Sequence, residues 1–330
     1  MTVQLPPIPD YPVSETPDDL PIDIPEHGTW PAGVHRFKAE TVAALRAAEA
    51  IGRPLLVRGL PGVGKSQTAR AAAAFANRPF LSIVIDGHTE PHDLMWRVDA
   101  VKRLSDAQAH QAKDELHYVQ PQALWWAYDW DGAQRQATNC GRASVPCEAP
   151  QVWKPNADRA VLLIDEIDKA DPDLPNALLD VLANKGFTPP FQGAQPVRCT
   201  AATRPLIVIT TNEERELPPA FLRRCLSITL ELPKDEQALI KELVLLGTQH
   251  QRYLTAIGQW PGPCHVLNEA AERIVAVRRG ADPGDYLPGT SEYLDLIGAL
   301  ATLYANNPAE QGRRIELLST FIRKTRSLSP

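Results

Sequence analysis

The amino-acid sequence predicts an α/β fold, in which a parallel β-sheet is sandwiched by helices and a smaller all-α domain follows. Near-continuous aliphatic runs alternate with helical segments over residues 53–212, a pattern typical of strands that are buried on both faces of a sheet. After Pro233 these runs stop, and apolar residues recur only at helical spacing. The change of pattern therefore predicts a domain boundary near residue 233.

The individual elements follow from the same patterns, taken in chain order. Before the boundary we expect helices at 37–51, about 64–77 and 173–186, and strands at 53–59, 79–86, 160–166 and 205–212. An alternating, β-like run follows Arg224. After the boundary, four segments have helical spacing: 234–257, 266–280, 290–307 and 309–328. Residues 129–158 are too irregular for an element and are interpreted as a long insertion loop.

The first 34 residues are rich in proline and contain six carboxylates but no Lys or Arg. Such a segment cannot propagate a helix and has little to bury, so we expect an extended or partly disordered arm. We therefore divide the chain into an arm at 1–34, an α/β domain at 35–232 and a helical domain at 233–330. The arm could dock on a neighbouring subunit or project freely.

The charge distribution bears on possible partners. The net charge of −6 equals that of the arm alone, so the rest of the chain is close to neutral. A neutral body weighs against nucleic-acid binding, which needs a basic face, although a local patch is not excluded. No apolar run reaches the length of a membrane span, and the first residues lack the pattern of a secretory signal. Five cysteines without a CxxC pair predict reduced thiols and a cytoplasmic protein.

The stretch "GLPGVGKS" at 59–66 fits the phosphate-binding pattern G-x-x-x-x-G-K-[ST], between a predicted strand and a predicted helix. Glycines allow the backbone N–H groups to form an anion nest, to which the helix adds its positive dipole end. Lys65 can reach the β- and γ-phosphates, and the Ser66 hydroxyl can ligate Mg²⁺. The predicted nucleotide-binding residues are Gly59, Pro61, Gly62, Val63, Gly64, Lys65, Ser66 and Gln67.

Polar side chains follow two further predicted strands. Asp165 ends the run "VLLID", at the strand end where ligands bind in open α/β sheets, and we expect it to hold Mg²⁺. Glu166 could then polarise a water for attack on the γ-phosphorus. Asn212 ends the run "LIVITTN" and could hydrogen-bond that water or the γ-phosphate. The carboxylates that come next, at 168, 171 and 173, are interpreted as a solvated helix start.

Together these motifs resemble those of AAA+ ATPases, the P-loop NTPases that combine an α/β domain with a helical lid. Residues 59–66 match the Walker A motif, 164–166 the Walker B motif and Asn212 the sensor 1 position. Within AAA+, "YVQPQALWWA", "DEIDKADPDLPNALLDVLANKGF" and "TNEERELPPAFLRRC" are most similar to the MoxR-like, dynein-related group. The resemblance implies ATP and Mg²⁺ as cofactors, and it alone favours ATP over GTP. It also implies an insertion at 93–120 and a hairpin at 187–204.

Arg223 and Arg224 in "FLRRC" match the region of the arginine finger of this family. The resemblance implies that one subunit's arginine contacts the γ-phosphate held by its neighbour in a ring, for which six subunits is the family expectation. We expect one arginine to be the finger and the other a supporting contact, with Arg224 favoured. MoxR-like lids usually carry a sensor 2 arginine, but the corresponding segment here is "LPGTSEYLDLI", with Glu292. Arg278 and Arg279 are candidate substitutes.

Three functional hypotheses follow. The first is an ATP-dependent protein-remodelling or assembly chaperone, which the resemblance pairs with a partner that bears a von Willebrand factor A (vWA) domain and with a protein client. The second is a nucleic-acid-linked motor. The third is a nucleotide-gated switch that acts by oligomerising, as in defence systems. Stimulation of turnover by a protein, stimulation by DNA, or ring formation without turnover would distinguish them.

Overall fold

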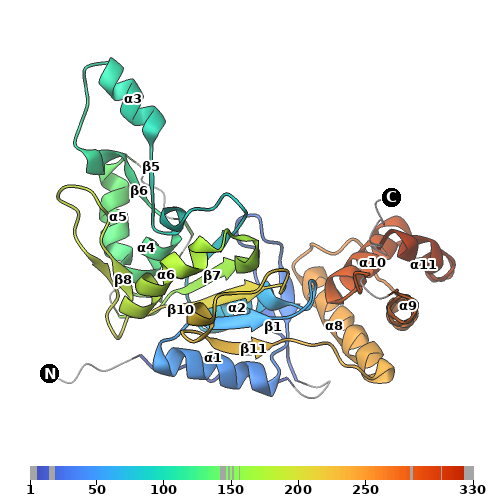
Figure 1. The fold of residues 1–330 in the computed structure, drawn as a ribbon. Coiled ribbons are helices and arrows are strands. Elements are labelled where there is room, and N and C mark those ends of the chain that lie inside the picture. The colour runs from blue at the N-terminus through green and yellow to red at the C-terminus, as the bar shows by residue number, and fades with distance from the viewer. Residues whose placement is uncertain are drawn as a thin grey trace. The chain divides into compact units, whose positions relative to one another are not determined.

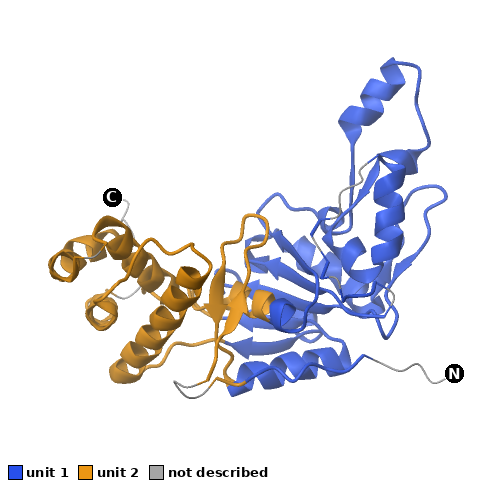
Figure 2. Ribbon diagram, turned by 180° about the vertical axis from the view of Figure 1, so that it is seen from behind, with its two compact units in different colours: residues 1–12, 39–58, 72–229 blue, residues 13–38, 59–71, 230–330 orange. Residues whose placement is uncertain are grey.

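The computed structural model describes residues 6–14, 19–141, 146–147, 149–150, 152–155, 157–282, 285–305 and 307–322. The chain forms two compact units, each assembled from separate segments (Figure 2). Unit 1 comprises residues 1–12, 39–58 and 72–229, and unit 2 comprises residues 13–38, 59–71 and 230–330. The phosphate-binding stretch thus groups with the helical C-terminal region, whereas the predicted strands group together in unit 1.

Unit 1 is built on a five-stranded sheet with the order β11-β3-β10-β7-β4 (Figure 1). Its strands are β3 (Leu55–Arg58), β4 (Phe80–Val84), β7 (Val161–Asp165), β10 (Leu206–Thr211) and β11 (Leu226–Thr229). Every neighbouring pair is parallel. The central strands β7 and β10 are buried along their whole length, which explains their unbroken aliphatic runs. The predicted fold class is confirmed.

Helices flank this sheet. They are α1 (Ala39–Ile51), α4 (Ala123–Tyr128), α6 (Asp173–Asn184), α7 (Pro219–Leu222) and α2 (Lys65–Phe75), which begins in unit 2. Helix α1 packs against β3 and β11, and α4 packs against β4 and β7. Helix α1 ends at Ile51, and the φ of 64° at Gly52, the next residue, lies in the left-handed region that terminates many helices.

Two excursions leave the sheet. The first contains η1 (Pro91–Leu94), β5 (Trp96–Val98), α3 (Ala100–Gln108), η2 (Glu115–Tyr118) and β6 (Val119–Pro121). Strands β5 and β6 pair antiparallel, and no residue of α3 is buried (Figure 1). The second excursion pairs β8 (Gly186–Phe187) with β9 (Val197–Arg198), which confirms the hairpin expected at 187–204.

The prediction of a loop throughout 129–158 is wrong for its first third, which forms helix α5 (Trp130–Asn139). Asp129 caps this helix by accepting a hydrogen bond from the backbone N–H of Gly132 at 2.9 Å. Trp130, Ala133 and Ala137 form its buried face. Polar residues and a glycine concealed this short apolar spacing. Residues 142–145, 148, 151 and 156 of the predicted loop lie outside the described residues.

Unit 2 joins a two-stranded sheet to the C-terminal helices. Strands β1 (Ile22–Ile24) and β2 (Gly33–His35) pair antiparallel, and β2 packs on α8 (Glu236–Ala256). The remaining helices are α9 (Leu267–Arg279), α10 (Thr290–Leu303) and α11 (Pro308–Ile322). The four helices share one apolar core, as expected for an all-α region. Residues 323–328 of the last predicted helix lie outside the described residues.

The expectation that the arm has little to bury is wrong for the described residues before position 35, although β1 is an extended strand. Ile22 and Ile24 alternate with an exposed Asp23, so one face of β1 is apolar and buried. Tyr11, which belongs to unit 1, is 2% exposed and donates a hydrogen bond to Glu49 at 2.6 Å. Residues 1–5 and 15–18 lie outside the described residues. None of the described helices is long and apolar enough to cross a membrane.

Candidate nucleotide-binding site

The phosphate loop, residues 59–66, leads from the end of β3 into α2. Gly59, Gly62 and Gly64 have φ values of 143°, 77° and 93°, which L-residues with a side chain rarely adopt. At Gly59 a side chain is excluded by space as well, because its Cβ would lie 2.5 Å from the carbonyl oxygen of Leu230. The glycines of the motif therefore meet a backbone requirement of the fold, as well as any requirement of a ligand.

Lys65 lies inside this loop and is only 7% exposed. Its ammonium group donates hydrogen bonds to the carbonyl oxygens of Gly59 and Leu60, each at 2.8 Å. The positive charge is thus held by the loop that would surround a phosphate. Pro61 and Val63 lie within the same loop, between its glycines.

Ser66 and Gln67 belong to the first turn of α2. The Gln67 side-chain oxygen accepts a hydrogen bond from Arg70 at 3.0 Å. The same guanidinium donates to the carbonyl oxygens of Pro25 and Pro31, and burial lowers the pKa of Arg70 to about 10. The segment before β2 is therefore tied to the start of α2, although Gln67 was expected only to contact nucleotide.

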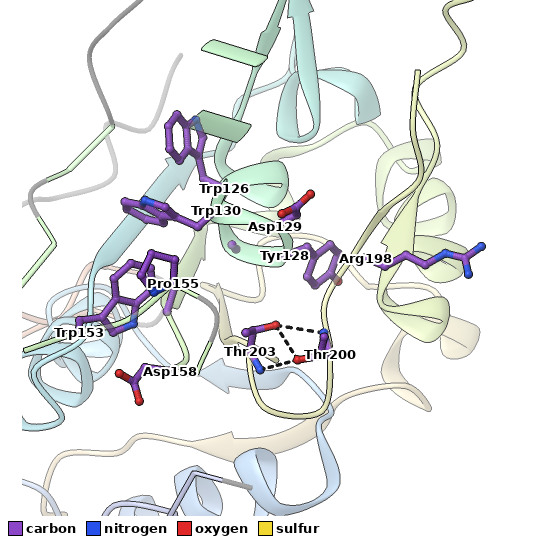
Figure 3. Close-up of a pocket in the computed structure, with 12 residues that line it drawn as sticks. Trp126, Tyr128, Asp129, Trp130, Trp153, Pro155, Asp158, Arg198, Thr200 and Thr203 are labelled. Atoms are coloured by element: carbon purple, nitrogen blue, oxygen red, sulfur yellow. Dashed lines mark hydrogen bonds between the residues drawn. The ribbon is translucent and has the colours of Figure 1, made fainter. Parts of the chain in front are cut away.

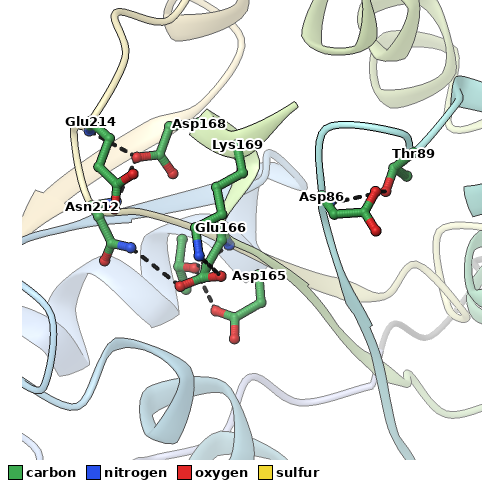
Figure 4. A network of polar contacts seen from close by, with 9 residues as sticks. Asp86, Thr89, Asp165, Glu166, Asp168, Lys169, Asn212 and Glu214 are labelled. Atoms are coloured by element: carbon green, nitrogen blue, oxygen red, sulfur yellow. Dashed lines mark hydrogen bonds and ion pairs between the residues drawn. The ribbon is translucent and has the colours of Figure 1, made fainter. Parts of the chain in front are cut away.

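In unit 1, the end of β7 carries the first predicted carboxylate. Asp165 is 8% exposed, and its Oδ1 accepts a hydrogen bond from the Thr210 hydroxyl at 2.5 Å (Figure 4). The Thr210 oxygen accepts in turn from the backbone N–H of Glu166 at 2.9 Å. Strand register places these residues together, because Ile209 of β10 pairs with Ile164 of β7. Sequence reasoning missed Thr210, since nothing in the sequence specifies this register.

The structure brings Glu166 and Asn212 together. The Asn212 amide donates to Glu166 Oε1 at 3.3 Å, and the Lys169 ammonium donates to Glu166 Oε2 at 2.6 Å (Figure 4). This hydrogen bond to Glu166 raises the pKa of Lys169. Glu166 itself has a φ of 60°, an uncommon value for a residue with a side chain. Sequence reasoning predicted Glu166 and Asn212 for the site but did not consider Lys169.

The interpretation of residue 168 as part of a solvated helix start is wrong. Asp168 is 2% exposed, and its Oδ2 accepts from the backbone N–H groups of Asn212 at 3.1 Å and Glu214 at 2.9 Å. A buried carboxylate with two N–H donors fixes the backbone after β10 strongly. Asp168 thereby places the Asn212 side chain. Its position three residues after Asp165 was visible in the sequence, but its burial was not.

The donor types fit a magnesium ion. Mg²⁺ prefers oxygen ligands and is usually held by one or two protein side chains together with phosphates and water. Asp165 offers a carboxylate and Ser66 a hydroxyl, each within its own unit. In the part of the chain that the structure describes, no three His, Cys, Asp or Glu side chains form a metal-binding cluster. A magnesium ion would therefore take most of its ligands from a bound nucleotide and from water.

Arg223 and Arg224 follow α7, and both are exposed. Arg224 Nη1 donates a long hydrogen bond to the carbonyl oxygen of Ala220, at 3.5 Å. Among the described residues, neither guanidinium forms an ion pair. The end of this short helix therefore exposes two permanent positive charges.

A cavity of about 100 Å³ in unit 1 lies near the β8–β9 excursion and is lined in part by Trp126, Trp130 and Trp153 (Figure 3). Its polar groups serve local turns: Asp129 caps α5, Asp158 accepts from the backbone of Lys154, and Thr200 and Thr203 bond to each other.

The model of the AAA domain of the dynein-related subfamily matches residues 54–225. The chain belongs to this family of AAA+ ATPases. The matched range contains the phosphate loop, the carboxylates after β7, Asn212 and both arginines that follow α7. The chain is similar to the crystal structure of a presumed ATPase from Cytophaga hutchinsonii, with 16% sequence identity and a TM-score of 0.37. The match covers 86% of this chain and 80% of that protein's chain. No curated protein matches the chain.

Proposed function

We propose that this AAA+ protein binds Mg-ATP and hydrolyses it to ADP and phosphate. The observation that carries the proposal is the pairing of the Glu166 carboxylate with the Asn212 amide at 3.3 Å. Each residue is fixed by a hydrogen bond from its backbone N–H: that of Glu166 donates to the Thr210 hydroxyl, and that of Asn212 donates to the Asp168 carboxylate. A carboxylate held in this way can accept a proton from a water molecule, and the amide beside it can orient that water for in-line attack.

The remaining roles follow from the chemistry of each side chain. The loop residues from Gly59 to Gln67 would hold the phosphates, with Lys65 leaving its backbone partners for the β- and γ-phosphates. Ser66 and Asp165 would hold Mg²⁺, which bridges phosphate oxygens and offsets their charge. We infer that residues 35–232 carry this chemistry and that residues 233–330 serve as its lid.

We further propose that the protein works as a homo-oligomeric ring, with six subunits as the family expectation, in the cytoplasm. The exposed guanidinium groups of Arg223 and Arg224, which form no ion pair with any residue that the structure describes, support this assembly, because a neighbouring nucleotide would give them an anionic partner. Heterologous contacts of this kind either close into rings or extend into filaments, and a closed ring is the form that we propose. As its biological role we propose protein remodelling or assembly, with a vWA-domain partner and a protein client.

The test is turnover of Mg-ATP by the full chain and by Glu166→Gln, compared at saturating nucleotide. The variant keeps the shape of the side chain but removes its basicity, so we expect kcat to fall by about 10²–10⁴-fold with nucleotide binding retained. Affinity purification of the same variant with ATP should retain the ring and its client. Wild-type protein that bound no Mg-nucleotide, or a variant with wild-type turnover, would contradict the proposal.

A further inference from the structure

Within unit 2, the start of α10 contacts the phosphate loop directly. The carbonyl oxygen of Gly62 accepts hydrogen bonds from the backbone N–H of Thr290 at 3.1 Å and from that of Ser291 at 3.4 Å. The Thr290 hydroxyl donates a further, short hydrogen bond to the same oxygen. Three donors thus converge on one carbonyl group, and the residues involved are 228 positions apart in the chain.

The helix is suited to this contact. The first N–H groups of a helix have no intrahelical partner, and their dipoles give this end a partial positive charge. In α10 two such N–H groups bind Gly62, while the Glu292 carboxylate accepts from the backbone N–H of Gly289 at 2.8 Å. The first two N–H groups of the helix therefore have partners that the fold itself supplies.

The two backbones approach closely at glycines. A Cβ on Gly289 would lie 3.1 Å from the Gly62 carbonyl oxygen, and a Cβ on Gly62 would lie 3.0 Å from Glu292 Oε2. Both distances are tighter than ordinary van der Waals contact. A side chain at either position would therefore crowd this contact, and the neighbouring atoms would have to shift.

The segment before α10 is fixed as well. Arg278 of α9 donates a hydrogen bond to the carbonyl oxygen of Pro288 at 2.6 Å. Burial lowers the pKa of Arg278, and the charge of Glu292 opposes that effect. By contrast, Arg279 forms an exposed ion pair with Glu236 on α8. The two arginines that were candidate substitutes for a lid arginine thus differ, and only Arg278 supports the segment that bears Thr290.

We propose that Thr290 is a positioning residue that presets the phosphate loop for nucleotide. This inference rests on the proposed function. A carbonyl held by α10 cannot turn toward a bound anion, so the loop N–H groups remain available for phosphate before the nucleotide arrives. Preorganisation of this kind strengthens binding because less ordering is left to occur on association.

The experiment compares Thr290→Val with Thr290→Ser in the full chain, using Mg-ADP as the probe so that hydrolysis does not interfere. Thr302→Val is the matched control, because Thr302 lies exposed on the same helix and its hydroxyl donates to the carbonyl of Gly298 within that helix. We expect Thr290→Val to weaken Mg-ADP binding about three- to ten-fold, as for loss of one hydrogen bond. Thr290→Ser should restore most of the affinity, and Thr302→Val should match the wild type.

Amide hydrogen exchange in nucleotide-free protein provides a readout that does not depend on binding. Exchange at residues 290–291 should be faster in Thr290→Val than in Thr302→Val. Equal Mg-ADP affinity in these two variants would overturn the inference while leaving the proposed function intact. If wild-type protein took up no Mg-ADP at all, the proposed function would fail, and this inference with it.

Discussion

The phosphate loop and the carboxylate cluster after β7 are organised in different ways. In the loop, shape depends on backbone: three glycines with positive φ, and carbonyl groups that bind Lys65 and the start of α10. In the cluster, shape depends on side chains from two neighbouring strands, where Thr210 and Asp168 hold Glu166 and Asn212. The loop is therefore held by backbone contacts, including those to the start of α10, whereas the cluster is fixed by the register of the sheet.

This difference separates two functions. In the loop, the hydrogen bonds from Lys65 to Gly59 and Leu60 can be exchanged for bonds to phosphate while the start of α10 holds Gly62, which suits the binding of a ligand. A cluster fixed by a sheet suits chemistry, since catalytic groups must be held to within a fraction of an ångström. Substitutions in the loop should therefore affect binding and stability, and substitutions in the cluster should affect turnover.

The substitution with the largest expected effect tests whether the carboxylate cluster after β7 supports ATP hydrolysis without an arginine from another subunit. We expect Arg224→Ala to lower kcat by of order 10³–10⁵-fold with nucleotide affinity unchanged, because a guanidinium that stabilises the transferred phosphoryl group is lost. Arg223→Ala is the matched comparison and should have the smaller effect. Steady-state turnover and equilibrium dialysis measure the two quantities.

Mixing decides where this arginine acts. Arg224→Ala and Glu166→Gln subunits should each be inactive alone but should recover part of the turnover when mixed. In a mixed ring, an intact Arg224 can meet an intact Glu166 of the neighbouring subunit. Full activity of Arg224→Ala alone would show that the cluster needs no arginine from elsewhere, and absence of recovery would place the arginine within its own chain.

An intermediate effect is expected from Thr210→Val, which keeps the size of the side chain but removes the hydroxyl. The buried N–H of Glu166 would lose its acceptor, at a cost of about 1–3 kcal/mol. If the loss of this hydrogen bond displaces Glu166, kcat should drop about 10- to 100-fold with little change in nucleotide affinity. Thr229→Val, on the exposed end of β11, is the control. A selective loss of affinity in Thr210→Val would contradict the separation of functions.

The smallest expected effect concerns His35, which is partly buried beside the phosphate loop. A Cβ on Gly64 would lie 3.8 Å from its ring, and desolvation lowers the pKa of His35 to about 4. Below about pH 6.5 the unfolded chain binds a proton that the folded chain excludes, so stability should fall as pH drops from 6.5 to 4. We estimate a contribution of about 1–3 kcal/mol, reduced by partial exposure.

The measurement is the free energy of unfolding against pH for wild type, His35→Gln and His88→Gln. The His35 variant should lose part of the decline between pH 6.5 and 4, whereas exposed His88 should be replaceable without effect on the profile. Burial also lowers the pKa of His250, so some decline should persist in every protein. If the free energy of unfolding of His35→Gln varied with pH as in the wild type, the folded protein would not exclude a proton from the His35 imidazole.

Much of the fold was predictable from local patterns. Strands buried in a parallel sheet are aliphatic throughout, so β3, β4, β7 and β10 were visible as runs, and the lid helices were visible as periodic spacing. The failures have physical causes as well. Helix α5 has too few apolar residues to show its period, and the arm pairs β1 with β2 although its composition predicts disorder.

The candidate site divides in the same manner. Residues that contact nucleotide or metal by their own chemistry, such as Lys65, Asp165 and Glu166, were accessible through motif and spacing. Residues that hold them in place were not, because their identities are unremarkable: Thr210 is one of several threonines, and Asp168 one of several carboxylates after β7. Their roles appear only when burial and hydrogen-bond partners are known.

By itself the sequence determined that a glycine-rich loop follows a buried strand, that two carboxylates end another strand, and that helices complete the chain. These are local properties, set by neighbours in the sequence and by the period of apolar residues. Only the tertiary structure decided that Thr210 bonds to Asp165, 45 positions away, and that Thr290 bonds to Gly62, 228 positions away. Such contacts depend on strand register and on the packing of the lid helices, which propensity and motif do not specify.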